Sequence, residues 1–152
     1  LAVGELGVAR SRQSATRRSH LASMRSLEQV GALVSGGAKA DEVWPATREA
    51  LVTTLRVRGA TFEPLASQTT LPEIERDGRI DVPDKRYRGD GFALPDEGVA
   101  LPVEAAGTRL GQIVLVPDPE VGVTREQRRT AVALADQLAI ALRRDSDVRA
   151  LS

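Results

Sequence analysis

Hydrophobic residues recur along the chain with two different periods, and the change of period separates helical from β regions. Between residues 19 and 35 apolar residues return every three or four positions, which predicts a helix that Gly36 and Gly37 end. The same spacing predicts a second helix over residues 42–55, with Asp41 as its N-cap residue. From residue 60 the period falls to two, which indicates strands.

The first part of the β region contains weak strands. Residues 60–63 form one expected strand. Residues 71–76 and 79–82 flank Asp77-Gly78, a dipeptide that strongly favours a two-residue hairpin turn. Prolines border this hairpin, so we expect it at an exposed edge of the sheet, followed by a polar loop over residues 83–98.

The second part contains the clearest strand pair, over residues 99–105 and 108–116, joined by a turn at Ala106-Gly107. The strand over residues 108–116 carries apolar residues on both of its faces. A strand of that kind is covered on both sides, so we expect it in the centre of the sheet.

The last helix begins with a recognisable capping box, in which Thr124 is followed by Gln127 three residues later. From residue 131 to 142 only Asp136 and Gln137 are polar, so the helix must be buried on more than one side. One side can cover the sheet, and the first helix together with a second subunit would cover the other. The residues expected in this dimer or helix interface are Leu21, Met24, Leu27, Leu134, Leu138 and Leu142.

Four sequence stretches carry a resemblance to a known family. They are Gly98-Val-Ala-Leu-Pro-Val103, Arg109-Leu-Gly-Gln-Ile-Val-Leu-Val116, Thr124-Arg-Glu-Gln127 and Ala133-Leu-Ala-Asp-Gln-Leu-Ala139. Together with the order of the elements, they resemble the C-terminal half of a GAF domain. The resemblance implies an α+β fold: a central antiparallel sheet of about five to six strands, with the N- and C-terminal helices packed on one face. Gly111 fits close backbone packing beside the central strand.

The expected organisation is a membrane-proximal or linker segment over residues 1–18, a GAF-like domain over residues 19–145, and a tail or signalling-helix extension over residues 146–152. Residues 1–9 are mildly apolar, and Arg10, Arg12, Arg17 and Arg18 follow them. This pattern is typical of the cytoplasmic end of a membrane helix, as in proteins similar to potassium-sensor kinases. The alternative is a frayed tail with a solvated charge cluster.

The resemblance implies a non-catalytic sensory module that forms a homodimer through its terminal helices. Such modules relay signals to other domains of the same polypeptide in signal-transduction proteins, for example in bacterial two-component systems. We expect a cytoplasmic location, or the cytoplasmic part of a membrane-anchored protein, without membrane insertion of this segment.

The alternative function is a small-molecule receptor, with a ligand between the sheet and the 83–98 loop. Prolines and glycines in that loop disfavour the helices that enclose larger ligands, so we expect a small pocket or none. The candidate wall residues are Phe62, Ile74, Tyr87, Phe92 and Leu101.

Composition narrows the function further. The 152 residues fit one domain, and 21 Lys and Arg balance 21 Asp and Glu, which argues against a nucleic-acid partner. The chain has no cysteine, which excludes disulfides and thiol chemistry, and its single histidine makes a metal or haem site a poor expectation, so no cofactor is expected. We interpret His20 as a helix-surface residue rather than a phosphoacceptor. The Phe92 to Glu97 match to a cyclic-nucleotide motif is interpreted as chance, because it lies in the wrong part of the fold.

Overall fold

The computed structural model describes the backbone of residues 2–151, and it describes the side chains of residue 18 and residues 20–145. The apolar run expected over residues 1–9, and Arg10, Arg12 and Arg17 behind it, lie outside the described side chains. The side chains of residues 146–152 also lie outside them. The elements in chain order are α1 (Ala2–Ser35), α2 (Ala40–Leu55), β1 (Gly59–Pro64), the 3-10 turns η1 (Leu65–Ser67) and η2 (Lys85–Tyr87), β2 (Phe92–Ala93), β3 (Val99–Ala105), β4 (Thr108–Val116), β5 (Gly122–Val123) and α3 (Arg125–Leu151).

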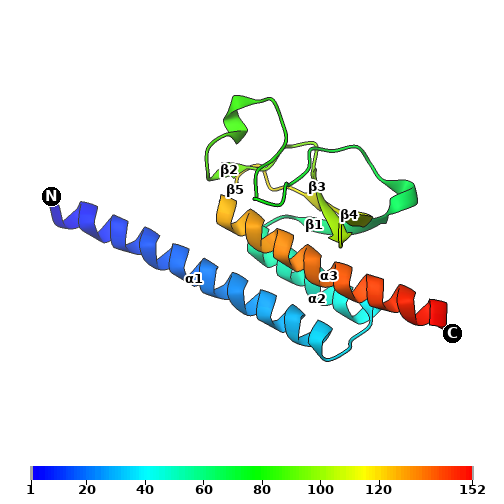
Figure 1. The fold of residues 1–152 in the computed structure, drawn as a ribbon. Coiled ribbons are helices and arrows are strands. Elements are labelled where there is room, and N and C mark those ends of the chain that lie inside the picture. Colours follow the sequence, from blue (N-terminus) through cyan, green and yellow to red (C-terminus); the bar gives the residue numbers. More distant parts are fainter. Residues whose placement is uncertain (1, 152) are drawn as a thin grey trace.

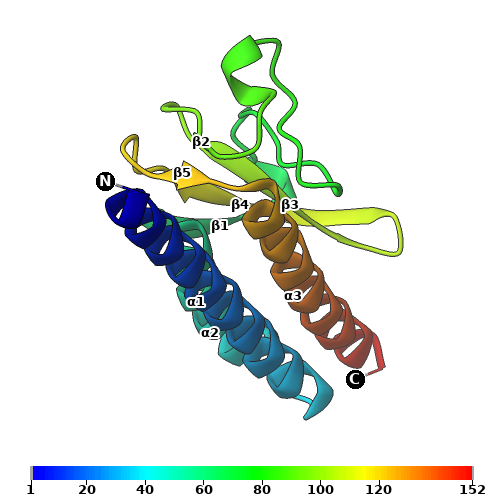
Figure 2. The same ribbon diagram turned by 90° about the vertical axis from the view of Figure 1, so that its left-hand side faces the viewer.

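The fold is α+β, as expected, with the helices and the sheet in separate layers. The central sheet is antiparallel with the order β1-β4-β3. Helices α2 and α3 lie side by side on one face of this sheet, and α1 packs against both of them on the side away from the strands (Figures 1 and 2). The opposite face of the sheet is covered by the segments between β1 and β3 (Figure 1).

The strand pair expected from the sequence is confirmed. Strands β3 and β4 occupy residues 99–105 and 108–116, with Ala106 and Gly107 in the turn, and β4 is the central strand. A bulge between Val103 and Glu104 shifts the register near the turn. The glycine expected to allow close packing does so: a Cβ atom on Gly111 would lie 2.6 Å from the backbone oxygen of Glu63.

The central sheet has three strands, fewer than the five to six expected. Strands β2 and β5 form a separate two-stranded pair. The expected hairpin over residues 71–82 keeps its turn at Gly78, but only the bridge between Ile74 and Ile80 forms across it. Residues 72–74 instead hydrogen bond to Ala100 and extend the β3 edge. Arg76, at the end of the first arm of this hairpin, pairs with Asp136 of α3.

The helix boundaries also correct the expectations at two points. Helix α1 begins at Ala2, so the helix expected from residue 19 is much longer. Helix α2 begins at Ala40, its N-cap residue is Lys39, and Asp41 lies inside the first turn rather than capping it. The capping box of α3 is confirmed, because Gln127 accepts from the Thr124 amide at 2.7 Å and the Thr124 hydroxyl accepts from the Gln127 amide at 3.2 Å.

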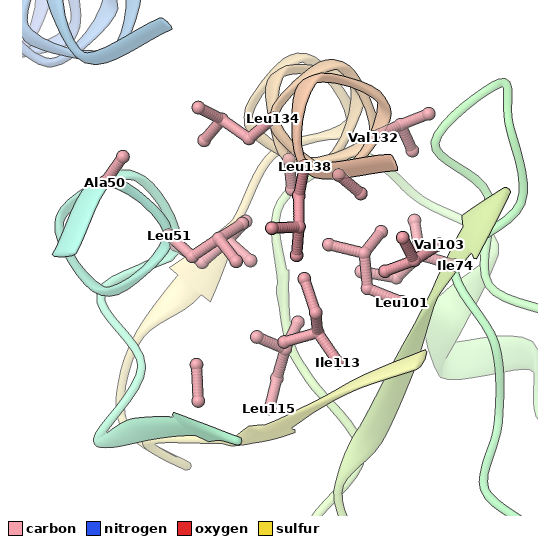
Figure 3. Close-up of a cluster of buried hydrophobic side chains, with 14 of the residues drawn as sticks. Ala50, Leu51, Ile74, Leu101, Val103, Ile113, Leu115, Val132, Leu134 and Leu138 are labelled. Atoms are coloured by element: carbon pink, nitrogen blue, oxygen red, sulfur yellow. The ribbon is translucent and has the colours of Figure 1, made fainter. Parts of the chain in front are cut away.

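The hydrophobic core fills the space between α2, α3 and the sheet. Figure 3 shows Leu138 pointing from α3 into the middle of this core, with Leu51 of α2 on one side and Ile113 and Leu101 of the sheet below. Leu134 points toward the side of α3 on which α1 and α2 lie (Figure 3). The apolar helix is therefore covered on two sides, by its own sheet and by its own helices.

Within the described part of the chain, no helix is long and apolar enough to cross a membrane.

Candidate functional site

The candidate interaction surface lies on α1, on the faces that do not touch the rest of the chain. Helix α1 packs inward through Ser23, Val30 and Val34, which are buried. Leu21 is 59% exposed and Met24 is 40% exposed, so both project away from that packed face. Large apolar side chains in water favour burial, so this surface is suited to a partner.

The interface residues expected from the sequence therefore fall into two groups. Leu134 and Leu138 are fully buried inside this chain, and Leu142 is half-buried against the same core. Leu21 and Met24 remain exposed. Leu27 is intermediate, because it is half-buried and packs against the core. Most of the apolar surface of α3 is thus used within the subunit, apart from Ile140, which is 47% exposed, and the expected interface residues that stay exposed are those of α1.

The N-terminal half of α1 extends past the other helices. His20 Nδ1 lies 3.1 Å from Glu126 Oε1, and Glu126 is in the first turn of α3. Helix α1 therefore passes the beginning of α3 near residue 20, and its earlier turns project from the body (Figure 1).

The structure disperses the five residues expected to line a ligand pocket. Ile74 and Leu101 are buried in the core beneath α3. Phe62 lies on β1 and packs against Trp44 of α2, with ring centroids 6.1 Å apart. Tyr87 and Phe92 contact each other edge to face, with centroids 5.2 Å apart. Only this last pair belongs to the segment over residues 83–98.

Two of the hollows lined by described residues bear on the predicted ligand site. One, of about 400 Å³, is lined entirely by residues of the 82–97 segment, with Tyr87 as its one expected member. The other, of about 640 Å³, is an open groove between α3 and the turn of the β3–β4 hairpin, with Ile140 and Arg143 on its helical side. Neither hollow lies between the central sheet and the 83–98 loop, where the sequence placed a ligand.

A buried arginine that the sequence did not reveal organises the loops near the start of α3. Arg128 is fully buried and donates hydrogen bonds to the carbonyl oxygens of Gly78, Asp90 and Val123. Its guanidinium carbon lies 4.5 Å from the ring centroid of Phe92. Burial lowers the pKa of Arg128, yet an arginine stays charged at any ordinary pH. The sequence pattern does not predict the burial of Arg128, because a charged residue in the first turn of a helix is usually exposed to solvent.

A polar cluster fills the sheet face opposite the helices. The buried Gln112 amide donates to Glu63 Oε1 at 2.9 Å and to the Thr69 carbonyl oxygen at 2.8 Å. Glu63 also accepts from the Thr69 amide and hydroxyl. The hydrogen bond from Gln112, followed by those from Thr69, lowers the pKa of Glu63, because each stabilises the ionised carboxylate. The side-chain amide of the buried Gln112 is thus hydrogen bonded, as buried polar groups in stable domains are.

A scan against protein-family models matches no family, and a search of curated proteins gives no match. Among the described residues, no group of three or more histidine, aspartate or glutamate side chains is arranged to hold a metal ion.

Proposed function

We propose that the chain is a non-catalytic regulatory module of the GAF type, which pairs with a second copy through α1 and relays a conformational change along its terminal helices. The observation that carries this proposal is the two-sided character of α1. One face of the helix is buried against α2 and α3, while Leu21 and Met24 on the other faces stay exposed.

The projecting half of α1 supports pairing between copies. Because a lone helical segment is marginal, a neighbouring helix would stabilise these turns. A second copy supplies the same helix with the same exposed leucine and methionine, and a two-fold axis beside α1 would bring them together. Pairing of this kind needs no rearrangement of the core.

The arrangement of the helix ends supports a relay. Helix α1 projects from one end of the helical layer, and α3 reaches its C-terminal end at the opposite end (Figure 1). Both helices pack against each other and against α2 along the body. A displacement of α1 would therefore act on α3 across a shared interface, and α3 would carry it past the far end of the sheet.

The test is the oligomeric state of matched leucine variants. The native chain should be a dimer by light scattering or sedimentation, and Leu21→Glu should make it a monomer. Leu65 provides the control, since it is 58% exposed, nearly the same as Leu21, but lies on η1 on the sheet side. Leu65→Glu should leave the dimer intact.

A native chain that stays monomeric at every accessible concentration would refute the proposal. Dimers that tolerate Leu21→Glu but dissociate with Leu65→Glu would place the interface elsewhere. Because the chain has no cysteine, a Leu21→Cys variant adds a direct check. Its oxidised form should run as a disulfide-linked dimer, whereas Leu65→Cys should cross-link poorly.

The second candidate function is a small-molecule receptor, favoured by the hollow of about 400 Å³ beside Tyr87. Its walls include the Tyr87 ring, the carboxylates of Asp96 and Glu97, and Arg86, which pairs with Asp84 at 2.7 Å and lies over the Tyr87 ring. A small organic amine, which would compete with Arg86 for these groups, is the ligand class to test. A rise in melting temperature with such amines that disappears in Tyr87→Ala would favour this function. No shift with any amine would remove it.

A further inference from the structure

The turn between α1 and α2 leaves backbone groups that need partners. The last carbonyl groups of a helix and the first amide groups of the next have no partner inside their own helices. Local hydrogen bonds from the amides of Gly36, Gly37 and Ala38 close the end of α1. At the start of α2, however, the side chain of the N-cap residue Lys39 makes no capping hydrogen bond.

Helix α3 supplies further partners for this turn, among them one for the Ala40 amide, through two adjacent residues. Arg144 Nη2 donates to the carbonyl oxygens of Val34 at 2.9 Å and of Ala38 at 3.2 Å. Asp145 Oδ2 accepts from the amide of Ala40, the first residue of α2, at 2.9 Å. We call this pair of residues the 144–145 clamp.

The charges of the clamp match the ends that they touch. A cation beside the C-terminal carbonyls of α1 and an anion beside the N-terminal amide of α2 both interact favourably with the helix dipoles. Asp145 therefore takes, from a distant part of the chain, the capping role that the sequence assigned to Asp41. The two contacts form together only when the end of α1, the start of α2 and this turn of α3 are in one register.

This directionality distinguishes the clamp from the rest of the interface between α1 and α3. The contact of His20 with Glu126 between the same helices is exposed to solvent. The rest of the described interface is dominated by apolar residues such as Val30, Val34 and Leu134, whose attraction is not directional and tolerates small sliding movements. Hydrogen bonds to fixed carbonyl and amide groups weaken steeply when their geometry changes. A movement of α1 along its axis would therefore act on α3 directly at Arg144, which holds the Val34 carbonyl, and through the turn and α2 at Asp145.

We propose that the 144–145 clamp is the coupling device of the module, which transmits a displacement of α1 to the C-terminal end of α3. This inference rests on the proposed relay function. Removing the side chains of the clamp should leave the fold and the pairing through α1 intact. The C-terminal end of α3 should then no longer respond to a displacement of α1.

The experiment imposes pairing on α1, so that it does not depend on whether the native chain dimerises. The Leu21→Cys chain is compared free and linked to a second copy with a bis-maleimide, and amide hydrogen exchange is followed in α3 beyond residue 140. Linking should change the exchange of these amides in the otherwise native chain. In Arg144→Met with Asp145→Ala the change should vanish, while exchange in the first turn of α2 quickens by roughly fivefold, as expected for a lost N-cap.

Two further variants keep the test decisive. Arg143→Met removes a neighbouring exposed arginine that makes no hydrogen bond to the turn among the described residues, and it should preserve the response to linking. Asp145→Asn keeps an acceptor for the Ala40 amide and should preserve much of the response. If the double variant fails to fold, the single variant Arg144→Met takes its place.

The outcomes separate the two proposals. If linked chains respond equally with and without the clamp, or do not respond in either case, the clamp is not a coupling device. A monomeric native chain whose linked form still shows clamp-dependent exchange would support the coupling inference and refute only the proposed pairing through α1.

Discussion

Gly111 gives the sharpest test of the packing between β1 and β4. It lies on the central strand opposite Pro64 of β1, and an added Cβ atom would sit 2.6 Å from the Glu63 backbone oxygen and 2.7 Å from Phe62 Cζ. Ordinary contacts at such a position begin near 3.4 Å. The Phe62 ring could turn away, but the Glu63 oxygen belongs to the strand backbone and can move only if the local β1–β4 pairing opens.

The expected cost of Gly111→Ala follows from two opposing effects. Overpacking a well-filled site costs about 1–3 kcal/mol, and a blocking backbone atom places this site near the upper end. Replacing glycine restricts the unfolded chain and returns about 0.4–1 kcal/mol. The net loss is about 2 kcal/mol, which lowers the melting temperature by roughly 4–8 °C in a chain of this length.

Urea unfolding and thermal melting measure this change, and Gly31→Ala is the control. Gly31 lies inside α1 with no atom within 4 Å of its added Cβ. There alanine should stabilise the protein by about 0.5–1 kcal/mol, because glycine is unfavourable within a helix. Opposite signs for the two glycines are expected. A Gly111→Ala protein as stable as the native chain would refute the close approach of β1 to β4.

Three further substitutions, the first with a matched control, test other parts of the structure. Leu138→Ala should cost about 2–5 kcal/mol in urea unfolding, because Leu138 is 1% exposed, whereas Ile140→Ala, at a position 47% exposed, should cost less than about 1 kcal/mol. Arg128→Met should lower the free energy of unfolding by about 2–4 kcal/mol, because three carbonyl groups lose their hydrogen-bond donor. It should also make the segment around residue 90 more sensitive to proteolysis, and unchanged proteolysis would contradict this role. The pKa of Glu63 is lowered in the folded state, so its stabilising contribution is present above its unfolded pKa and is lost as pH falls through the folded pKa. Glu63→Gln should therefore flatten the loss of stability in acid, and an unchanged acid limb would argue against the Gln112–Thr69 cluster.

The sequence was most informative where a local pattern determines the structure. Alternation and a tight turn were sufficient to place β3 and β4, and the spacing of Thr124 and Gln127 was sufficient to place the start of α3. Strands β2 and β5 contain two residues each, which is too short for any period to appear. The number of strands in the central sheet was overestimated for another reason. The expected strands over residues 71–76 and 79–82 form only the bridge between Ile74 and Ile80, so they add no strand to that sheet.

Contacts between distant polar residues could not be predicted in the same way. Asp136 interrupts an apolar run in α3, and nothing nearby in the sequence indicates that it receives two hydrogen bonds from Arg76. Arg128 and Arg144 likewise resemble solvated helix residues, although both donate to backbone carbonyl groups of remote segments. Such partners depend on the tertiary arrangement, which charge patterns along one helix do not encode.

The structure also changes the argument for pairing between copies. From the sequence, the unusually apolar α3 required a cover beyond the sheet, and a second subunit was one way to provide it. In the structure α1 and α2 cover that surface, so Leu134 and Leu138 give no reason for a second copy. The helix that now needs a partner is α1, because it covers α3 with one face and leaves its other faces in water. Leu21 and Met24 lie on those faces, and the case for pairing now depends on them.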